Sequence, residues 1–335
     1  MSPALIEARA LSVDVPAGRF AFAKARPLAI LAGVSLAIRP GEIVCMVGES
    51  GSGKTTFGRA LLGLVKPSGG EILLDGTPLP DFSQRSFRAI RSQTSLLFQD
   101  PLSSFNPRQR IGAMIAEPRR IAGMGSARLE DIAGLAQQAG LSDRFLSRFP
   151  HALSGGQARR AAVARALSVV PRLIVADEPT AGLDVSIQGG VLNLFLDIRE
   201  RHDTAFLMIT HNLSVVRHIA DHIVILYLGR MVESGPAAEI LSAPKHPYTK
   251  ALLEAEPIPD PTRRRTAPPV LGEVPSIAAR PSGCEFHTRC PFVQPRCRSE
   301  APGLDDSAEG RRVACHFPLP EPRPAAAHSL RTVSN

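Results

Sequence analysis

The sequence predicts an α/β protein with a largely parallel β-sheet, because strand-sized apolar runs alternate with stretches of helical periodicity. Ile43–Val47 is the first clear buried strand. It leads into a glycine-rich turn, and we expect a helix over Lys54–Leu64. A second series of elements follows in the same manner. It consists of a helix at Gly156–Val169, a strand at Leu173–Ala176, a helix at Val185–Glu200, a strand at Phe206–Ile209 and a helix at Ser214–Ala220.

Two other regions have a different character. Between Ser86 and Phe149 the apolar spacing is helical and turn residues are frequent, which predicts a helical insertion between parts of the sheet. After Pro236 prolines become frequent and helical periodicity fades. We therefore predict a first domain over residues 1–235 and a C-terminal extension over residues 236–335. No internal repeat is visible, so the first domain is expected to be a single unit.

Composition limits the classes of function. The 44% hydrophobic content suits a globular protein with a core, and the longest apolar runs are strand-sized, far short of the ~20 residues of a membrane-spanning helix. The N-terminus lacks the pattern of a secretory signal, so a cytosolic location is expected. The formal charge of +8 comes from scattered arginines, and the tightest cluster, Arg263–Arg265, lies in a proline-rich stretch. We therefore do not expect a nucleic-acid partner, whereas attraction to acidic lipids or an acidic protein surface remains open.

The glycine-rich turn has the pattern G-x-x-x-x-G-K-[ST] between a buried strand and a helix, which is the context that a phosphate-binding loop requires. Its glycines let successive N–H groups converge on phosphate oxygens at a helix N-terminus. Lys54 is expected to contact the β- and γ-phosphates of a nucleotide, and Thr55 to offer a hydroxyl to Mg²⁺. The residues expected to bind nucleotide here are Gly48, Glu49, Ser50, Gly51, Ser52, Gly53, Lys54, Thr55 and Thr56.

Two carboxylates follow the buried strand Leu173–Ala176. Asp177 reaches the carboxyl end of the sheet, where nucleotides bind in open α/β folds, and is expected to hold the metal, through water. Glu178 is then placed to accept a proton from the attacking water. Alone, two acidic residues after a strand are more often a solvated helix start, but the upstream phosphate loop favours the catalytic interpretation. Together these motifs predict a P-loop NTPase.

A pentapeptide narrows this class. Leu153, Ser154, Gly155, Gly156 and Gln157 precede the Asp177 strand by about twenty residues, and this segment resembles the signature of ABC ATPases. Ser154 can cap the following helix, whose N-terminus then forms an anion site. The resemblance implies that this site binds the γ-phosphate of ATP held by a second ATPase subunit. It also implies an ABC-type fold, with a parallel-sheet core, an antiparallel β subdomain and a helical subdomain at about residues 100–168.

Three further positions resemble family motifs. Gln99, in Leu97–Pro101, resembles the Q-loop glutamine, which implies contact with Mg²⁺ and a face towards the membrane partner. Asp184, in Ala181–Asp184, resembles the D-loop aspartate and would contact the opposite subunit, although the family more often has Ser at Ala181. His211 resembles the switch histidine that bonds the γ-phosphate.

One family feature is missing. The place where an aromatic residue usually stacks on adenine reads Ser12–Pro16, so Phe20 or Phe22 would have to substitute. Both phenylalanines are equally suited to be core residues. A strict preference for ATP over GTP therefore does not follow from the sequence.

Three local matches resemble the ATPases of oligopeptide and dipeptide importers. They are Phe149–His151 before the signature, Lys245–Leu253 with Pro257–Pro261, and Leu271–Pro275 before the cysteines. This resemblance implies peripheral attachment at the cytoplasmic face of the inner membrane, two permease subunits, an identical or different second ATPase and an external solute-binding protein. A nickel or other small-solute importer is an alternative, and a soluble ABC ATPase acting on nucleic acid or ribosomes is a more distant one.

Four of the five cysteines lie in the extension. Cys284, Cys290, Cys297 and Cys315 could ligate zinc or an iron–sulfur cluster. Zinc sites usually contain a tight C-x₂₋₄-C pair, which is missing here, so the wider spacing favours a cluster. The resemblance implies a [4Fe–4S] cluster; zinc, free thiols and a His287 or His316 ligand remain alternatives. Cys45, in the strand before the phosphate loop, is expected to be a small buried hydrophobic residue.

Overall fold

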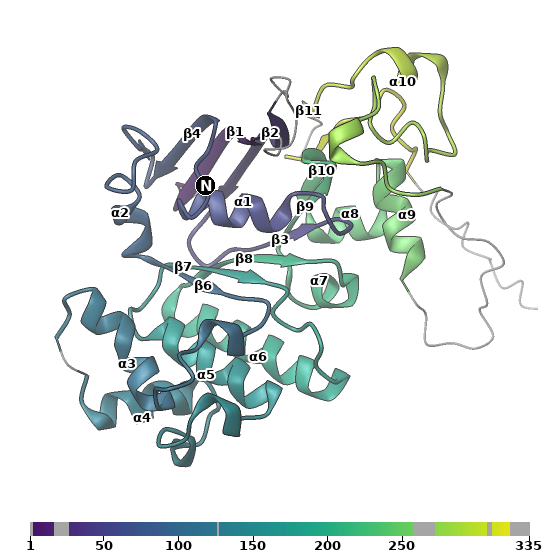
Figure 1. The fold of residues 1–335 in the computed structure, drawn as a ribbon. Coiled ribbons are helices and arrows are strands. Elements are labelled where there is room, and N and C mark those ends of the chain that lie inside the picture. Colours follow the sequence, from purple (N-terminus) through teal and green to yellow (C-terminus); the bar gives the residue numbers. More distant parts are fainter. Residues whose placement is uncertain (1–2, 17–26, 126, 257–271, 307–309, 322–335) are drawn as a thin grey trace, which may run out of the picture.

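The computed structural model describes residues 3–16, 27–125, 127–256, 272–306 and 310–321. Its larger sheet has the strand order β11-β12-β10-β9-β3-β8-β7-β6, and the five strands from β9 to β6 are parallel (Figure 1). The strands are β3 (Ile43–Val47), β6 (Thr94–Leu97), β7 (Leu173–Asp177), β8 (Ala205–Thr210), β9 (His222–Tyr227), β10 (Arg230–Pro236), β11 (Asp305–Asp306) and β12 (Arg312–Val313). The predicted α/β class with a largely parallel sheet is confirmed.

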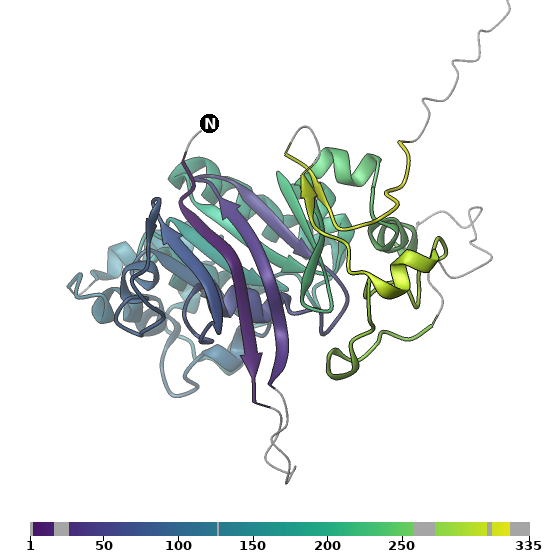
Figure 2. The ribbon, with the colours of Figure 1, turned by 90° about the horizontal axis from the view of Figure 1, so that it is seen from above.

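A second sheet is antiparallel and has the order β2-β1-β4-β5. It comprises β1 (Ile6–Val15), β2 (Leu28–Ile38), β4 (Gly69–Leu74) and β5 (Thr77–Pro78). Seen from above, the long strands β1 and β2 lie over the larger sheet (Figure 2). This is the antiparallel β subdomain that the ABC resemblance implied.

The helices fall into three groups. Helix α1 (Lys54–Leu61) lies between the two sheets, whereas α6 (Val185–His202) and α7 (Leu213–Ile219) cover the other face of the larger sheet. The helical subdomain contains α3 (Ile111–Ile121), α4 (Leu129–Gln138) and α5 (Gly155–Leu167). The remaining α-helices are α2 (Arg88–Arg91), α8 (Ala237–Ser242), α9 (Pro247–Ala255) and α10 (Pro295–Ser299); the 3₁₀ turns are η1 (Leu102–Ser104), η2 (Asp143–Phe145), η3 (Pro150–Ala152) and η4 (Ile277–Ala279). No helix within the described ranges is long and apolar enough to cross a membrane.

The core is divided by the larger sheet. Ile43, Cys45 and Val47 point towards the helical face, while Val44 and Met46 point towards α1 and the antiparallel sheet. All five residues of β3 are buried, which is typical of a central parallel strand covered on both faces. Cys45 is fully buried and its pKa is raised by desolvation, in agreement with its predicted role as a small hydrophobic residue.

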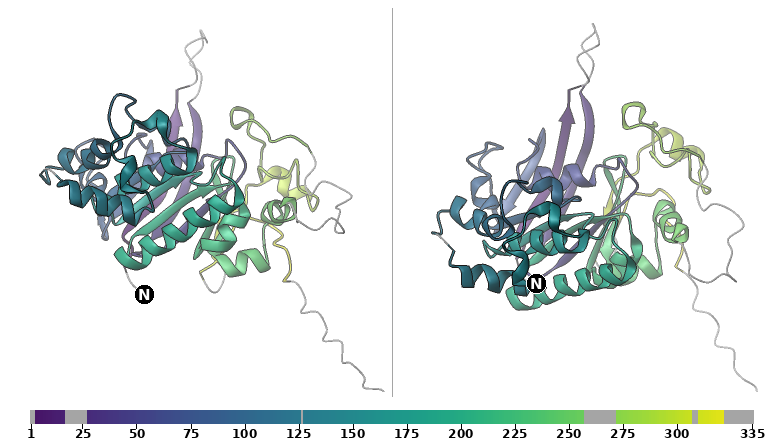
Figure 3. Two further views of the ribbon diagram at one scale, coloured as in Figure 1. Left: turned by 90° about the horizontal axis from the view of Figure 1, so that it is seen from below. Right: turned by 60° about the horizontal axis from the view of Figure 1, so that its bottom comes forward.

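One expectation about the architecture needs correction. The stretch from Ser86 to Phe149 is not helical throughout, because it contains β6, which pairs with β7 at the edge of the larger sheet. At the other edge of the sheet, strand β12 of the extension pairs with β10. The helical subdomain and the extension consequently lie at opposite sides of the molecule (Figure 3). Because β10 runs to Pro236, it reaches across the predicted boundary at residue 235, which stays a prediction.

Two glycines that end helices offer a matched test of packing. Gly63 and Gly123 each follow a helix in the left-handed region, at φ 68° and 71°. A Cβ on Gly63 would lie 2.2 Å from the ring of Phe87, whereas a Cβ on Gly123 would meet nothing within 4 Å. We expect Gly63→Ala to lower the free energy of unfolding by about 1–3 kcal/mol more than Gly123→Ala, since both introduce backbone strain but only the first overpacks the core. Urea denaturation of both variants measures the difference; equal losses would contradict it.

Candidate functional site

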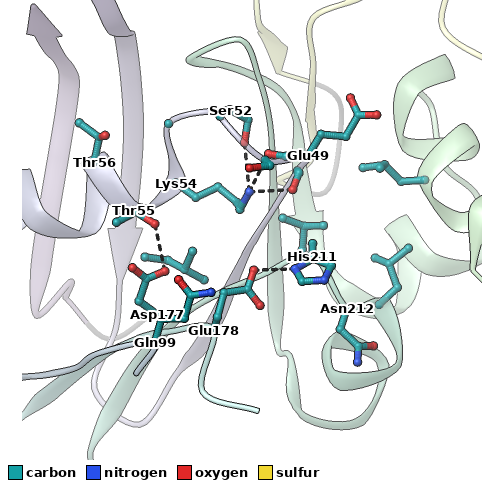
Figure 4. A pocket seen from close by; sticks show the side chains of 18 of the residues that line it. Glu49, Ser52, Lys54, Thr55, Thr56, Gln99, Asp177, Glu178, His211 and Asn212 are labelled. Atoms are coloured by element: carbon teal, nitrogen blue, oxygen red, sulfur yellow. Dashed lines mark hydrogen bonds and ion pairs between the residues drawn. The ribbon is translucent and has the colours of Figure 1, made fainter. Parts of the chain in front are cut away.

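The predicted nucleotide-binding residues line one cavity of about 1150 Å³ between the phosphate loop, the ends of β7 and β8, and helix α9 (Figure 4). Its lining includes Gly48, Glu49, Ser50, Gly51, Ser52, Gly53, Lys54, Thr55, Thr56, Gln99, Asp177, Glu178 and His211. Residues that are far apart in the sequence meet here because β3, β7 and β8 are adjacent parallel strands. Their carboxyl ends face the cavity, as expected for nucleotide sites in open α/β sheets.

The loop requires glycine at two close approaches. A Cβ on Gly48 would lie 2.3 Å from the carbonyl oxygen of Leu226, so only glycine lets the loop pass over β9. Gly53 has φ 97° and precedes α1, and a Cβ there would lie 2.7 Å from Leu31. These two glycines fix the path by which the loop enters the helix.

Lys54 is the first residue of α1, and it is buried against the loop. Its ammonium donates to the carbonyl oxygens of Gly48 and Glu49 at 2.7 and 2.8 Å, and to the Ser52 hydroxyl at 3.3 Å. Burial lowers the pKa of Lys54, while the nearby carboxylates of Glu178 and Asp177 oppose this shift. A polyanion entering the cavity would offer this cation stronger acceptors than the loop carbonyls.

A hydroxyl and a carboxylate meet at the start of α1. The Thr55 hydroxyl donates to Asp177 Oδ1 at 3.0 Å, and Gln99 lies beside this pair (Figure 4). Desolvation raises the pKa of Asp177, although the hydrogen bond from Thr55 opposes the shift. The side chains of Thr55, Asp177 and Gln99 each carry an oxygen atom, and oxygen atoms are the ligands that Mg²⁺ prefers.

The second carboxylate pairs with the predicted switch histidine. Glu178 Oε1 lies 2.7 Å from Nδ1 of His211, which follows β8. The carboxylate is largely buried, with 14% of its side chain exposed, whereas the imidazole is 70% exposed. Glu178 has φ 47°, a strained value for a side chain of its size, and its N–H donates to the Ile209 carbonyl at 2.8 Å. The backbone is therefore held so that Glu178 faces both the cavity and His211.

The signature residues lie at the N-terminus of α5. Ser154 caps α5: its hydroxyl accepts from the Gln157 N–H, and its own N–H donates to the Gln157 side chain. The capping role of Ser154 is confirmed. Leu153, Gly155 and Gly156 complete the signature at this helix N-terminus, and Asp184 precedes α6. Neither motif lines the phosphate-loop cavity within the described part of the chain.

Sequence reasoning missed Arg159, which connects the signature helix to the segment that follows β7. Its guanidinium donates to the backbone oxygens of Glu178 at 3.4 Å and Ala181 at 3.1 Å, and it is 4% exposed. An arginine two positions after the signature looks like an ordinary helix residue. No sequence signal distinguishes it from Arg160 and Arg165 in the same helix, so its role emerges from the fold.

The base-stacking position is not resolved by the fold. Phe20 and Phe22 lie outside the described residues, so their assignment stays open. The aliphatic side chains of Ile30 on β2 and Ile277 in the extension do line the cavity. The extension therefore contributes to the wall of the site, through Ile277, through Leu252 and Ala255 on α9, and through Glu256 directly after α9.

The four cysteines of the extension meet as predicted. Cys284, Cys290, Cys297 and Cys315 line one small cavity of about 10 Å³, together with His287 and His316. Within the described ranges, however, no group of three or more His, Cys, Asp or Glu residues is arranged to hold a metal ion. Burial raises the pKa of Cys284 and of Cys315 to about 11, and the four side chains pack around a space no larger than a water molecule. A preformed iron–sulfur or zinc site is therefore not confirmed.

Comparisons with known proteins agree with the geometry. Residues 31–181 match the ABC transporter family, and residues 232–297 match the oligopeptide/dipeptide transporter C-terminal region. A probable peptide ABC transporter ATP-binding protein of Sinorhizobium fredii is 41% identical over 98% of this chain and 93% of its own length. A di/tripeptide transport ATP-binding protein of Pseudomonas aeruginosa is 43% identical over 93% of this chain and 97% of its own length.

A solved structure gives the same fold. It is a dimeric ATP-binding cassette in a post-hydrolysis state bound to ADP and Pi, 26% identical in sequence, with a TM-score of 0.62 over 69% of this chain and 98% of that chain. The chain belongs to the family of ABC transporter ATP-binding proteins, and it is an ABC-type ATPase.

Proposed function

We propose that the chain binds Mg-ATP in the phosphate-loop cavity and hydrolyses it with Glu178 as general base. The observation that carries this proposal is the meeting of Thr55, Asp177, Glu178 and His211 in one cavity. Lys54 and the loop N–H groups would hold the β- and γ-phosphates, and Thr55, Asp177 and Gln99 would hold Mg²⁺, Asp177 through water. The metal would supply charge neutralisation between the phosphates.

In the chemical step, water attacks the γ-phosphorus while Glu178 accepts its proton. The bond from the γ-phosphorus to the bridging oxygen breaks, and ADP leaves with the electron pair. His211, bonded to Glu178, would orient this carboxylate and contact the γ-phosphate. The attacking water would lie close to Glu178. Because this carboxylate is largely buried, it would take the proton of that water and exchange few protons with bulk solvent.

We propose further that the site is completed by a second ATPase subunit. The capped N-terminus of α5 presents Ser154, Gly155 and Gly156 as an anion site without a phosphate loop beside it in the same chain. A partner subunit's signature would therefore cover the nucleotide held here, and Asp184 would contact that partner. Closure of such a dimer on ATP and its reopening after hydrolysis would drive a membrane partner.

The proposed cargo is a dipeptide or oligopeptide. Support comes from the match of residues 232–297 and from relatives named for peptide and di/tripeptide transport. Two permease subunits, peripheral attachment at the cytoplasmic face of the inner membrane and an external solute-binding protein complete the proposed importer. Reconstitution of the chain with its permeases, partner ATPase and binding protein tests this: ATP-dependent uptake of a labelled dipeptide is expected. Uptake of nickel but not of peptide would assign nickel as the cargo. Co-purification with RNA instead of permeases would overturn the assignment as a transporter subunit.

For the cysteines we propose a [4Fe–4S] cluster rather than zinc. The four cysteines line one cavity, which supports this donor set, and ligation requires deprotonation of the thiols. Anaerobically purified protein is expected to show a broad visible absorbance band that fades on reduction, and to contain iron and acid-labile sulfide. A colourless protein with stoichiometric zinc would refute the cluster.

A further inference from the structure

An ion pair connects the cysteine segment, residues 284–297, to the phosphate loop. Arg289, next to Cys290, donates from Nη1 to Glu49 Oε2 at 2.7 Å and from Nη2 to Glu49 Oε1 at 2.9 Å. The two residues are 240 positions apart in the sequence. Glu49 directly follows the first glycine of the loop, so the extension contacts the loop itself.

The geometry separates this pair from an ordinary surface ion pair. The two N–H donors engage both carboxylate oxygens, an arrangement that is strong and directional. The Arg289 side chain is only 6% exposed, and its guanidinium lies 5.9 Å from the ring centres of Tyr227 and Phe286. Removing the arginine would leave the Glu49 carboxylate without its partner in a partly buried place.

Glu49 is held at two further atoms. Its N–H donates to the hydroxyl of Tyr248 on α9 at 2.9 Å, and its carbonyl oxygen accepts from Lys54 Nζ at 2.8 Å. Tyr248 is fully buried and packs against Tyr227 and Phe286. The anchors from Arg289 and Tyr248 thus both come from the extension, whereas the carbonyl oxygen of Glu49 is held within the loop region by Lys54 and by the Ser52 N–H at 3.2 Å. Because a phosphate loop works by aiming successive N–H groups at phosphate oxygens, displacement of its second residue changes that aim.

We propose that Arg289 is a positioning residue for nucleotide binding, which sets the phosphate loop through Glu49 and makes the ATP site depend on the folded state of the cysteine segment. The inference rests on the proposed nucleotide site. The Arg289 N–H donates to the Phe286 carbonyl at 3.0 Å and the Cys284 N–H to the Cys297 carbonyl at 2.9 Å, so the guanidinium is aimed by the local fold around the thiols. If the fold around the thiols loosened, the Arg289 guanidinium would no longer hold the Glu49 carboxylate.

The first test measures MgADP affinity by calorimetry, which involves neither hydrolysis nor closure on ATP. Arg289→Ala is expected to weaken MgADP binding about tenfold and to raise KM for ATP similarly, with kcat within about threefold of wild type. Arg289→Lys keeps the charge but not the two parallel donors, so an intermediate loss is expected. The matched control is Arg296→Ala, which removes an exposed arginine paired with Glu300 in the same segment and should leave both quantities unchanged.

A double-mutant cycle excludes a merely structural role. In a Glu49→Gln background, Arg289→Ala or Arg289→Lys should cost little further affinity, because the partner carboxylate is already gone. The same loss in both backgrounds would overturn the proposal, as would a lowered melting temperature with unchanged MgADP affinity in Arg289→Ala. If the alanine variant does not fold, the lysine variant decides by the same comparison. Wild-type protein that binds no MgADP would refute the nucleotide site instead.

The dependence on the cysteine segment has its own test. Cys290→Ser is expected to weaken MgADP binding, and adding Arg289→Ala to it should weaken binding little more, since both changes release the same carboxylate. Full additivity of the two losses, or wild-type affinity in Cys290→Ser, would overturn the dependence of the ATP site on this segment.

Discussion

Replacing Glu178 with Gln is expected to lower kcat for ATP hydrolysis by at least about 100-fold while MgATP affinity stays within about threefold of wild type. The amide keeps the shape of the side chain and can still contact His211, but it cannot accept a proton from the attacking water. Glu178 lies at the end of β7 with its carboxylate 2.7 Å from His211 and makes no hydrogen bond to the loop that holds the phosphates. This variant should therefore bind MgATP nearly as tightly as wild type but hydrolyse it much more slowly.

Single-turnover hydrolysis and equilibrium nucleotide binding measure the two effects. Glu130→Gln, an exposed change on α4 far from the cavity, is the matched control and should retain wild-type turnover. Hydrolysis by Glu178→Gln at the wild-type rate would remove Glu178 from its proposed role. ATP is also expected to trap Glu178→Gln as a dimer, visible by size-exclusion chromatography, because the closed state is no longer opened by hydrolysis.

Lys54→Met is expected to abolish measurable nucleotide binding, with an affinity loss of at least about 100-fold. Methionine fills a similar volume but cannot donate to phosphate oxygens, and nothing else in the loop supplies a positive side chain. The Lys54 ammonium is buried among loop carbonyls, so its loss also leaves the Gly48 and Glu49 carbonyl oxygens without this donor.

Calorimetry with MgATP and MgADP measures the loss, and thermal unfolding confirms that the variant is folded. The control is Lys66→Met, which changes an exposed lysine beyond the end of α1 and should not affect binding. A folded Lys54→Met protein with wild-type affinity would show that the phosphates lie elsewhere.

The sequence predicted the parts of the molecule whose chemistry is local. A strand, a glycine loop and a helix define the predicted phosphate site within residues 43–61, and four apolar residues place Asp177 at the end of its strand. Ser154 could be assigned as a cap because the cap bonds to Gln157, only three positions away. In each case the spacing of neighbouring residues carries the information.

What the sequence did not predict depends on contacts between distant segments. The four residues of β6 lack a recognisable alternation, and their strand conformation comes from pairing with β7. Arg159 and Arg289 look like ordinary charged residues until the fold brings them to Glu178 and Glu49. The convergence of the cysteines could be anticipated from their clustering, but their close packing around one small cavity comes from the fold of the extension.

The pairing of β12 with β10 has a consequence for protein synthesis. Val313 pairs with Glu233, and the Ala314 N–H donates to the Val232 carbonyl at 2.8 Å, so the end of the described chain closes an edge of the sheet that is made much earlier. On the ribosome, β10 therefore waits as an open edge until residues 312–314 have emerged. Chains that terminate before β12 keep this edge unpaired, which exposes them to edge-to-edge aggregation and to degradation.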